Sequence, residues 1–309
     1  MKTFVVATLI VLPASAVAEG DPKFEYGKSD DVNEVRDVEW DASAEGGVVF
    51  TTGNSKTTTV AAGFKASRKT GQNKLAIDGG LTYAKSSIRT LAMGVDPALP
   101  IRRDDIITTS TTTAETLFGK VRYDRFLTKH NSLFIAALAS RDVPAGKAAV
   151  VGGQAGYSRQ LFKSDVSEAL AEIGYDFSHE DLVTGPAVDI HSARGLVGYK
   201  ATLATGTTFD GSAEVLTNLN KEDLVTRDAS LGEDTRVNLR AAVSAKLGRN
   251  LALQTSFEGK YDNRPAPLVL GGKPVMLIGE SGALEASSFD TIMKVSLIYS
   301  FFQKPDNKK

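Results

Sequence analysis

The chain has no cysteine, only three histidines among 309 residues, and a net charge of −1. Without cysteine, no disulfide framework can support a small secreted fold. The balanced charge lacks the basic excess that nucleic-acid binding requires. No phosphate-binding loop, metal-ligand spacing or nucleophile motif is present. We therefore expect no cofactor, no bound metal and no nucleic-acid partner.

Beyond the N-terminus, no apolar run is long enough for a membrane-spanning helix. The N-terminus itself has the features of a secretory signal peptide over residues 1–18. Lys2 provides a basic start, an apolar stretch follows, and a small-x-small pattern ends at Ala18, where we expect cleavage. Residues 19–40 are acidic and lack periodicity, which predicts a mostly unstructured periplasmic lead-in. Residues 303–309 form a polar tail.

Between residues 41 and 302, apolar and polar residues alternate with the period-2 pattern of β-strands. In the segment 251–262, for example, Leu253 and Phe257 share one face, whereas Glu258 and Lys260 share the other. The pattern predicts about twelve strands of membrane-spanning length. The expected strands are 42–52, 56–69, 73–86, 115–127, 132–142, 148–162, 166–180, 190–203, 207–219, 235–247, 251–262 and 288–302.

The connections between these segments alternate in length. Tight turns follow every second strand, whereas most of the other connections are longer, including a polar stretch over 87–112. Short turns at one rim and long loops at the other are typical of outer-membrane barrels. Aromatic residues near several strand ends suit the girdles of such barrels: Trp40, Tyr83, Tyr123, Tyr175, Tyr261 and Tyr299. We predict an all-β, transmembrane, antiparallel up-and-down β-barrel in the Gram-negative outer membrane, in contact with its lipid.

A soluble periplasmic β-protein stays open as an alternative, because alternation alone does not decide which face meets solvent. In the barrel interpretation, the charged faces line the lumen. The lumen-facing candidates are Glu168, Glu172, Asp176, Arg194, Lys200, Arg236, Arg240, Lys246, Glu258 and Lys260. Their mixed signs favour internal ion pairs and a narrow lumen, so we expect a pore for a small solute or an envelope-structural role.

Four segments carry a resemblance to a known family: TTGNSKTTT (51–59), VRYDRFL (121–127), YDNRPAP (261–267) and FDTIMKVSLIYSFF (289–302). Together they resemble the salt-induced outer membrane proteins, a Gram-negative barrel family of unknown function, over roughly residues 41–302. The resemblance implies an outer-membrane barrel. It implies no substrate and no catalytic residues.

The last strand also resembles the signal that the barrel-assembly machinery recognises in outer-membrane proteins. The matching residues are Lys294, Ser296, Tyr299 and Phe301. Ser296 stands where this signal usually has glycine, and the polar tail extends past the final aromatic residues. We nevertheless expect the assembly machinery to be a partner.

Two histidines offer an enzymatic alternative. His179 and His191 fall on the apolar face at facing ends of neighbouring strands, where a lipid-active enzyme would need a histidine. Ser178 and Ser192, the adjacent nucleophile candidates, fall on the opposite face by register. We therefore expect a protein without catalytic activity.

Overall fold

The computed structural model describes residues 38–51, 55–91, 106–143, 146–183, 185–222, 228–270, 273–274, 276, 283–285 and 287–301. The predicted signal peptide with its cleavage point at Ala18, most of the lead-in and the polar tail lie outside these residues. Among the described residues, no helix is long and apolar enough to cross a membrane.

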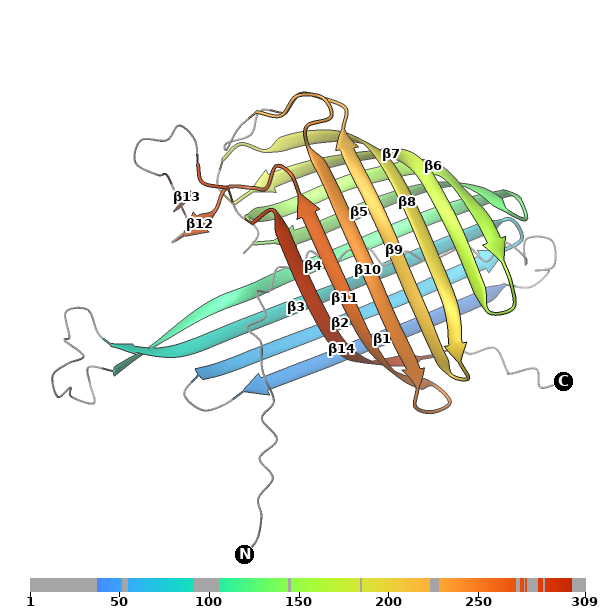
Figure 1. Ribbon diagram of the computed structural model, residues 1–309, viewed down its shortest axis with the longest axis horizontal. Helices are drawn as coiled ribbons and strands as arrows, with labels where there is room; N and C mark the ends of the chain where they lie inside the picture. The colour runs from blue at the N-terminus through green and yellow to red at the C-terminus, as the bar shows by residue number, and fades with distance from the viewer. Residues whose placement is uncertain are drawn as a thin grey trace, which may run out of the picture.

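Twelve long strands form the body of the molecule, and a two-residue pair, β12 and β13, lies within the connection between β11 and β14 (Figure 1). The strands are β1 (Glu39–Thr51), β2 (Ser55–Thr70), β3 (Asn73–Leu91), β4 (Ile106–Thr128), β5 (Asn131–Asp142), β6 (Lys147–Lys163), β7 (Ser167–Leu182), β8 (Val188–Ala204), β9 (Thr207–Asn218), β10 (Thr235–Lys246), β11 (Leu251–Asp262), β12 (Val269–Leu270), β13 (Lys273–Pro274) and β14 (Phe289–Ser300).

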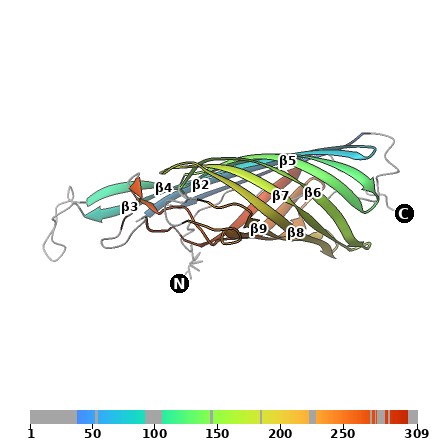
Figure 2. The same ribbon diagram turned by 90° about the horizontal axis from the view of Figure 1, so that it is seen from above.

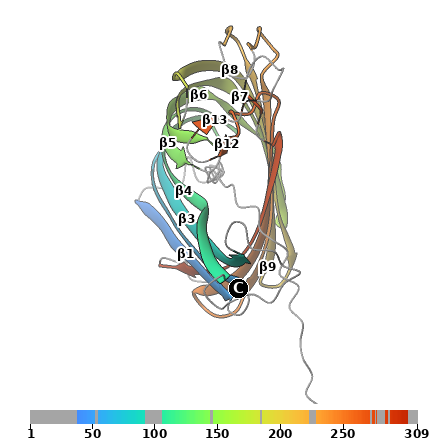
Figure 3. The same ribbon diagram turned by 90° about the vertical axis from the view of Figure 1, so that its left-hand side faces the viewer.

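The twelve long strands pair with their sequence neighbours, and β14 pairs with β1 to close the barrel. Every pair is antiparallel, so the predicted fold class is confirmed. The closing seam is short: the register joins Ser43 to Ser300 and runs only to Gly46 and Leu297, whereas β11 pairs with β14 along its whole length. Figures 2 and 3 show that the closed wall is flattened rather than round.

The predicted polar connection over 87–112 is wrong in its extent. β3 continues to Leu91 and β4 begins at Ile106, so the hairpin projects beyond its neighbours (Figure 1). Hydroxyl side chains join its two strands, with Ser87 Oγ 2.7 Å from Ser110 Oγ. Because threonine and serine occupy both faces of this ribbon, the sequence shows no apolar–polar alternation there. β-branched threonine nevertheless favours an extended backbone.

The two faces of the wall differ in chemistry. Large apolar side chains point outward and are exposed, as for Ile173 at 67%. All six aromatic residues predicted for the girdles are exposed on this outer face too. Most charged side chains of the wall point inward and are buried, as for Glu172 and Asp176, and they alternate with a smaller set of inward apolar residues such as Leu170. The arrangement is the reverse of a water-soluble protein, in which the apolar face is the buried one.

A glycine on β6 lets a phenylalanine ring lie against the inner wall. Gly156 on β6 pairs with Gly174 on β7, and a Cβ atom added to Gly156 would lie 2.8 Å from Cζ of Phe134. Phe134 itself is almost fully buried. Gly156 therefore makes room for the Phe134 ring, and Gly174 lets the backbones of β6 and β7 approach each other closely.

We expect Gly156→Ala to destabilise the barrel by about 1–3 kcal/mol, because the added methyl group overlaps Phe134 and the backbone of β7. Urea titration of the refolded protein measures the change. Gly195→Ala is the matched control, since nothing lies within 4 Å of its added Cβ. Equal effects of the two substitutions would show that Phe134 is not closely packed.

Candidate functional site

The centre of the barrel contains a continuous series of ion pairs, called here the central ion-pair chain: Arg122 on β4, Glu172 on β7, Arg194 on β8 and Glu214 on β9. Arg122 Nη2 donates to Glu172 Oε1 over 2.7 Å, and Arg194 Nη1 donates to Glu172 Oε2 over 2.9 Å. Arg194 Nε then donates to Glu214 Oε1 over 2.5 Å. The side chain of Glu172 has no exposed surface. Such buried charges are tolerable only because each one is paired.

Further contacts hold the central ion-pair chain in place. Asp124 accepts hydrogen bonds from Nε and Nη2 of Arg122, the latter over 2.7 Å. The ring of Phe134 lies under the same guanidinium, 4.1 Å from its centroid to Cζ of Arg122. Stacking of this kind suits a planar guanidinium. Asn238 Nδ2 donates to the second oxygen of Glu214 over 3.0 Å. Side chains from several strands therefore hold the central ion-pair chain in place.

A second group of charged side chains lies nearer the end that carries the longer loops, and we call it the mouth cluster: Lys147, Glu180, Asp234 and Arg236. Glu180 lies between the two cations, 3.1 Å from Lys147 Nζ and 3.0 Å from Arg236 Nη1. Arg236 Nε lies 3.3 Å from Asp234. Between the two groups, Gln154 accepts from Lys120 over 3.1 Å and donates to Asp176 over 2.8 Å.

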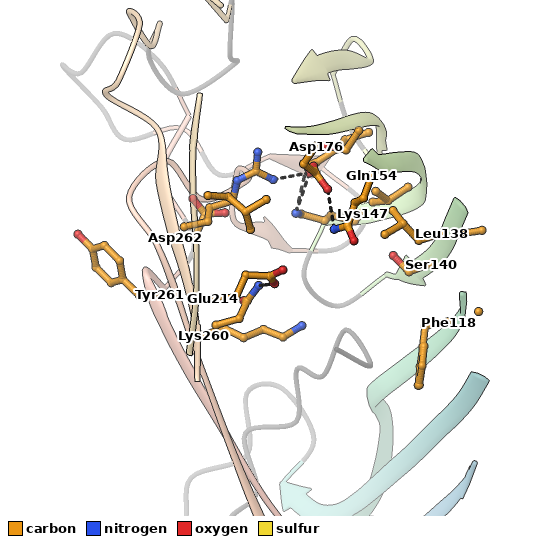
Figure 4. Close-up of a pocket in the computed structure, with 18 residues that line it drawn as sticks. Phe118, Leu138, Ser140, Lys147, Gln154, Asp176, Glu214, Lys260, Tyr261 and Asp262 are labelled. Carbon is orange, nitrogen blue, oxygen red and sulfur yellow. Dashed lines mark hydrogen bonds and ion pairs between the residues drawn. The ribbon is translucent and has the colours of Figure 1, made fainter. Parts of the chain in front are cut away.

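These side chains leave open space beside them. A cavity of about 150 Å³ lies between a wall that carries Glu214 and Lys260 and a wall that carries Phe118 and Leu138 (Figure 4). A smaller cavity of about 20 Å³ toward the mouth shares four of its lining residues, and another of about 40 Å³ shares Phe118. Side chains of the central ion-pair chain therefore fill one part of the interior. Beside them lie three neighbouring cavities that share lining residues.

The predicted lumen-facing residues follow the inward register of their strands, at different depths. Glu172, Asp176, Arg194 and Glu258 are buried, whereas Lys200 and Lys246 are exposed near the short turns. The remaining candidates are partly buried: Glu168, Arg236, Arg240 and Lys260. Glu258 pairs with Lys294 on β14 at 3.3 Å.

The sequence analysis missed half of the central ion-pair chain. Arg122 lies within VRYDRFL, which the sequence analysis used only as a family feature, and Glu214 lies in β9, for which it named no lumen-facing candidate although Asp210 and Asn218 share the register of Glu214. The signal was present, since Lys120, Arg122 and Asp124 alternate with outward residues. A single strand pattern does not indicate which distant carboxylate such cations meet.

The two histidines of the enzymatic alternative lie on the outer face. His179 Nδ1 is 2.6 Å from Asp189, and His191 contacts the hydroxyl of Tyr175. Ser178 and Ser192 face inward and are buried, on the other side of the wall. Among the described residues, no group of three or more acidic, histidine or cysteine side chains is placed to hold a metal ion.

In the last strand, Tyr299 faces outward and its ring meets Phe301 edge-on at 5.2 Å. Lys294 and Ser296 occupy the inward register of the same strand. Recognition of these residues by the assembly machinery stays a prediction.

The fold and interior define a closed, twelve-stranded antiparallel barrel with a charged lumen. The chain belongs to the family described as protein of unknown function, DUF481, whose model matches residues 44–301. No curated protein is a significant match to the chain.

Solved structures of two porins and of an outer membrane protein are similar to this chain. The NanC porin is 10% identical, with a TM-score of 0.43 over 84% of this chain and 98% of that one. An anion-selective porin from Comamonas acidovorans is 11% identical, with a TM-score of 0.37 over 86% and 99% of the two chains. OmpT of Vibrio cholerae is 10% identical, with a TM-score of 0.35 over 85% and 97%.

We expect Glu172→Ala to reduce the free energy of unfolding by about 3–5 kcal/mol, because it leaves two buried guanidinium groups without their shared carboxylate. Denaturant titration of the refolded protein measures the loss. Glu115→Ala is the control, since Glu115 and Arg141 form an exposed pair at 3.3 Å whose loss should cost about 1 kcal/mol or less. If Glu172→Ala lowered the free energy of unfolding as little as Glu115→Ala does, the central ion-pair chain would not stabilise the barrel.

Proposed function

We propose that the protein is an integral outer-membrane barrel that gives small polar solutes a narrow passage along its lumen. The observation that carries the membrane assignment is the inverted wall: exposed apolar side chains outside and buried charges inside. Contact of this apolar outer face with lipid hydrocarbon is favourable, whereas its exposure to water would cost free energy. This supports the barrel over the soluble periplasmic alternative. Induction by salt, which the family resemblance implies, stays a prediction.

The series of cavities supports a passage rather than a purely structural role. The cavities share lining residues from the mouth cluster to Phe118, and each is lined by charged as well as apolar side chains. The cavity of about 150 Å³ is lined by the cations Lys147, Arg236 and Lys260 and by several carboxylates, so neither sign of charge dominates. We infer weak ion selectivity and a size limit set by the constrictions between cavities.

The proposal includes no catalytic role. A hydrolase on the outer face would need a nucleophile beside His179 or His191. The neighbouring serines, Ser178 and Ser192, lie on the lumen side of the wall. A histidine with an acidic partner, as in His179 with Asp189, is by itself a polar contact at the rim of the outer face.

Conductance of the purified protein in planar bilayers tests the passage. Phe118 lies where two cavities meet, so we expect Phe118→Ala to join them and raise the single-channel conductance. Leu117→Ala is the matched control, because Leu117 neighbours Phe118 on β4 but points outward. A protein that inserts without conducting would favour the envelope-structural role. Equal, measurable conductance in both variants would keep the passage and refute only the constriction at Phe118.

The membrane assignment predicts that the cost of an outward charge depends on depth. Ile173 is near the middle of β7, so Ile173→Arg should destabilise the inserted barrel by about 2–4 kcal/mol. Leu203 is equally outward but next to the end of β8, so Leu203→Arg should cost about 0–1 kcal/mol. Folding titrations into lipid vesicles measure both. Recovery of the wild-type protein in the soluble periplasmic fraction would refute the assignment outright.

A further inference from the structure

The described stem of the connection between β9 and β10 lies at the barrel mouth, because its Glu222 lines a small cavity together with inward side chains of β6, β7, β10 and β11. Of this connection, the structure describes residues 219–222 and 228–234. The backbone N–H groups of Glu222 and Ala229 each donate to the other residue's carbonyl over 2.9 Å. Asn220 ties the stem to β8, accepting from the His191 N–H over 2.9 Å and donating to the Asp189 carbonyl over 2.8 Å. The stem thus has one well-defined closed arrangement.

Within this closed arrangement, two carboxyl groups are buried without enough donors. Glu222 is 2% exposed, and neither of its carboxyl oxygens has a hydrogen-bond partner among the described residues. Asp234 is 3% exposed, and its Oδ1 is likewise without a partner there. A buried carboxylate in this position loses its hydration and gains no donor in return.

The surrounding charges do not remedy this deficit. Glu222 and Asp234 line one small cavity together with Lys147 of β6, Glu180 of β7, Arg236 of β10, Asp262 of β11 and Arg264. Lys147 and Arg236 contact Glu180, and Arg264 Nη2 lies 3.3 Å from Glu233. Arg236 Nε also lies 3.3 Å from Asp234, but Asp234 Oδ1 and both carboxyl oxygens of Glu222 stay without a hydrogen-bond partner among the described residues. Glu180 and Asp262 add further negative charge. A proton is the smallest species that would satisfy the pair.

Burial and the neighbouring carboxylate of Asp234 raise the pKa of Glu222 to about 7. Burial, with Asp262 and Glu180 close by, raises the pKa of Asp234 to about 6 against the opposing effect of Arg236. Both residues therefore hold a proton more tightly in the closed arrangement than a solvated carboxyl group would.

We propose that Glu222 and Asp234 form a proton-binding pair that fastens the described stem of the β9–β10 connection (219–222 and 228–234) at the barrel mouth when protonated and releases it when the proton is lost. A protonated carboxyl group becomes a donor to its neighbour, which removes both the repulsion and one unpaired oxygen. The stem is then held in acid and loosens near neutral pH. The effect on solute passage rests on the proposed function, whereas the movement of the connection does not.

The direction of the pH effect follows from the linkage between proton binding and the closed arrangement of the stem. Because the carboxyl pKa values are raised in the closed state, its extra stability is present in acid and is lost as the pH rises toward those values. With the pKa of Glu222 at about 7 when closed and an ordinary value near 4.5 when open, the opening constant should rise on the order of 30-fold between pH 5 and pH 7.

Hydrogen exchange of residues 219–234 in the detergent-solubilised full chain tests the proposal, after correction for the intrinsic pH dependence of exchange. We expect wild-type protection to fall between pH 5 and pH 7. Glu222→Gln should keep the connection protected at both values, because the amide is neutral and carries a donor. Asp234→Asn should act in the same direction. Asp228→Asn is the control: Asp228 belongs to the same connection but is exposed, and it should behave as wild type.

Protection that does not change with pH in the wild type would overturn the proposal. So would a pH dependence that survives unchanged in Glu222→Gln and Asp234→Asn. Conductance measured at the same pH values separates the two inferences. A channel that conducts without pH-dependent exchange would refute the proton-binding pair alone, whereas pH-dependent exchange in a barrel that does not conduct would refute only the passage.

Discussion

The structure depends on one constraint: a wall whose outer face is apolar must place its charges inside, and charges inside must be paired. Glu172 shows how this requirement is met, since one carboxylate without exposed surface binds the guanidinium groups of Arg122 and Arg194. Removal of two charges from water is costly, and only close, hydrogen-bonded partners offset that cost. The interior of the barrel is organised around these pairs.

The pairing also determines the shape of the lumen. The central ion-pair chain joins β4 to β7, β8 and β9 across the inside of the curved wall, with Phe134 filling the space beneath Arg122. Gly156 provides the room for that ring. One side of the flattened barrel is therefore packed. The cavities lie beside this packed side, so the proposed passage is narrow.

The mouth differs from the centre in one respect. In the centre, each carboxylate of the ion-pair chain has a cation or an amide as its donor, whereas Glu222 has no such donor among the described residues. A buried carboxyl group of this kind is stable only when protonated. The same requirement that stabilises the centre makes the β9–β10 connection sensitive to pH in our proposal.

Local pattern was sufficient to predict the strands, their faces and the alternation of short turns with long loops, because a period of two is a property of each strand by itself. It failed over 87–112, where serine and threonine occupy both faces of the β3–β4 ribbon and no alternation exists to detect. It also predicted that charges such as Glu172, Arg194 and Arg236 line an interior.

The sequence by itself therefore determined the all-β class and which residues of each alternating strand share a face, because the period of two is local. Which face turns inward was decided by closure of the wall. The tertiary structure alone decided which charges meet. Arg122 and Glu172 are 50 residues apart and lie on strands separated by two others, so their contact exists only after the wall has closed and flattened. The tertiary structure alone also decided that Glu222 is buried without a hydrogen-bond donor among the described residues, because its burial depends on residues from several strands and not on the loop sequence.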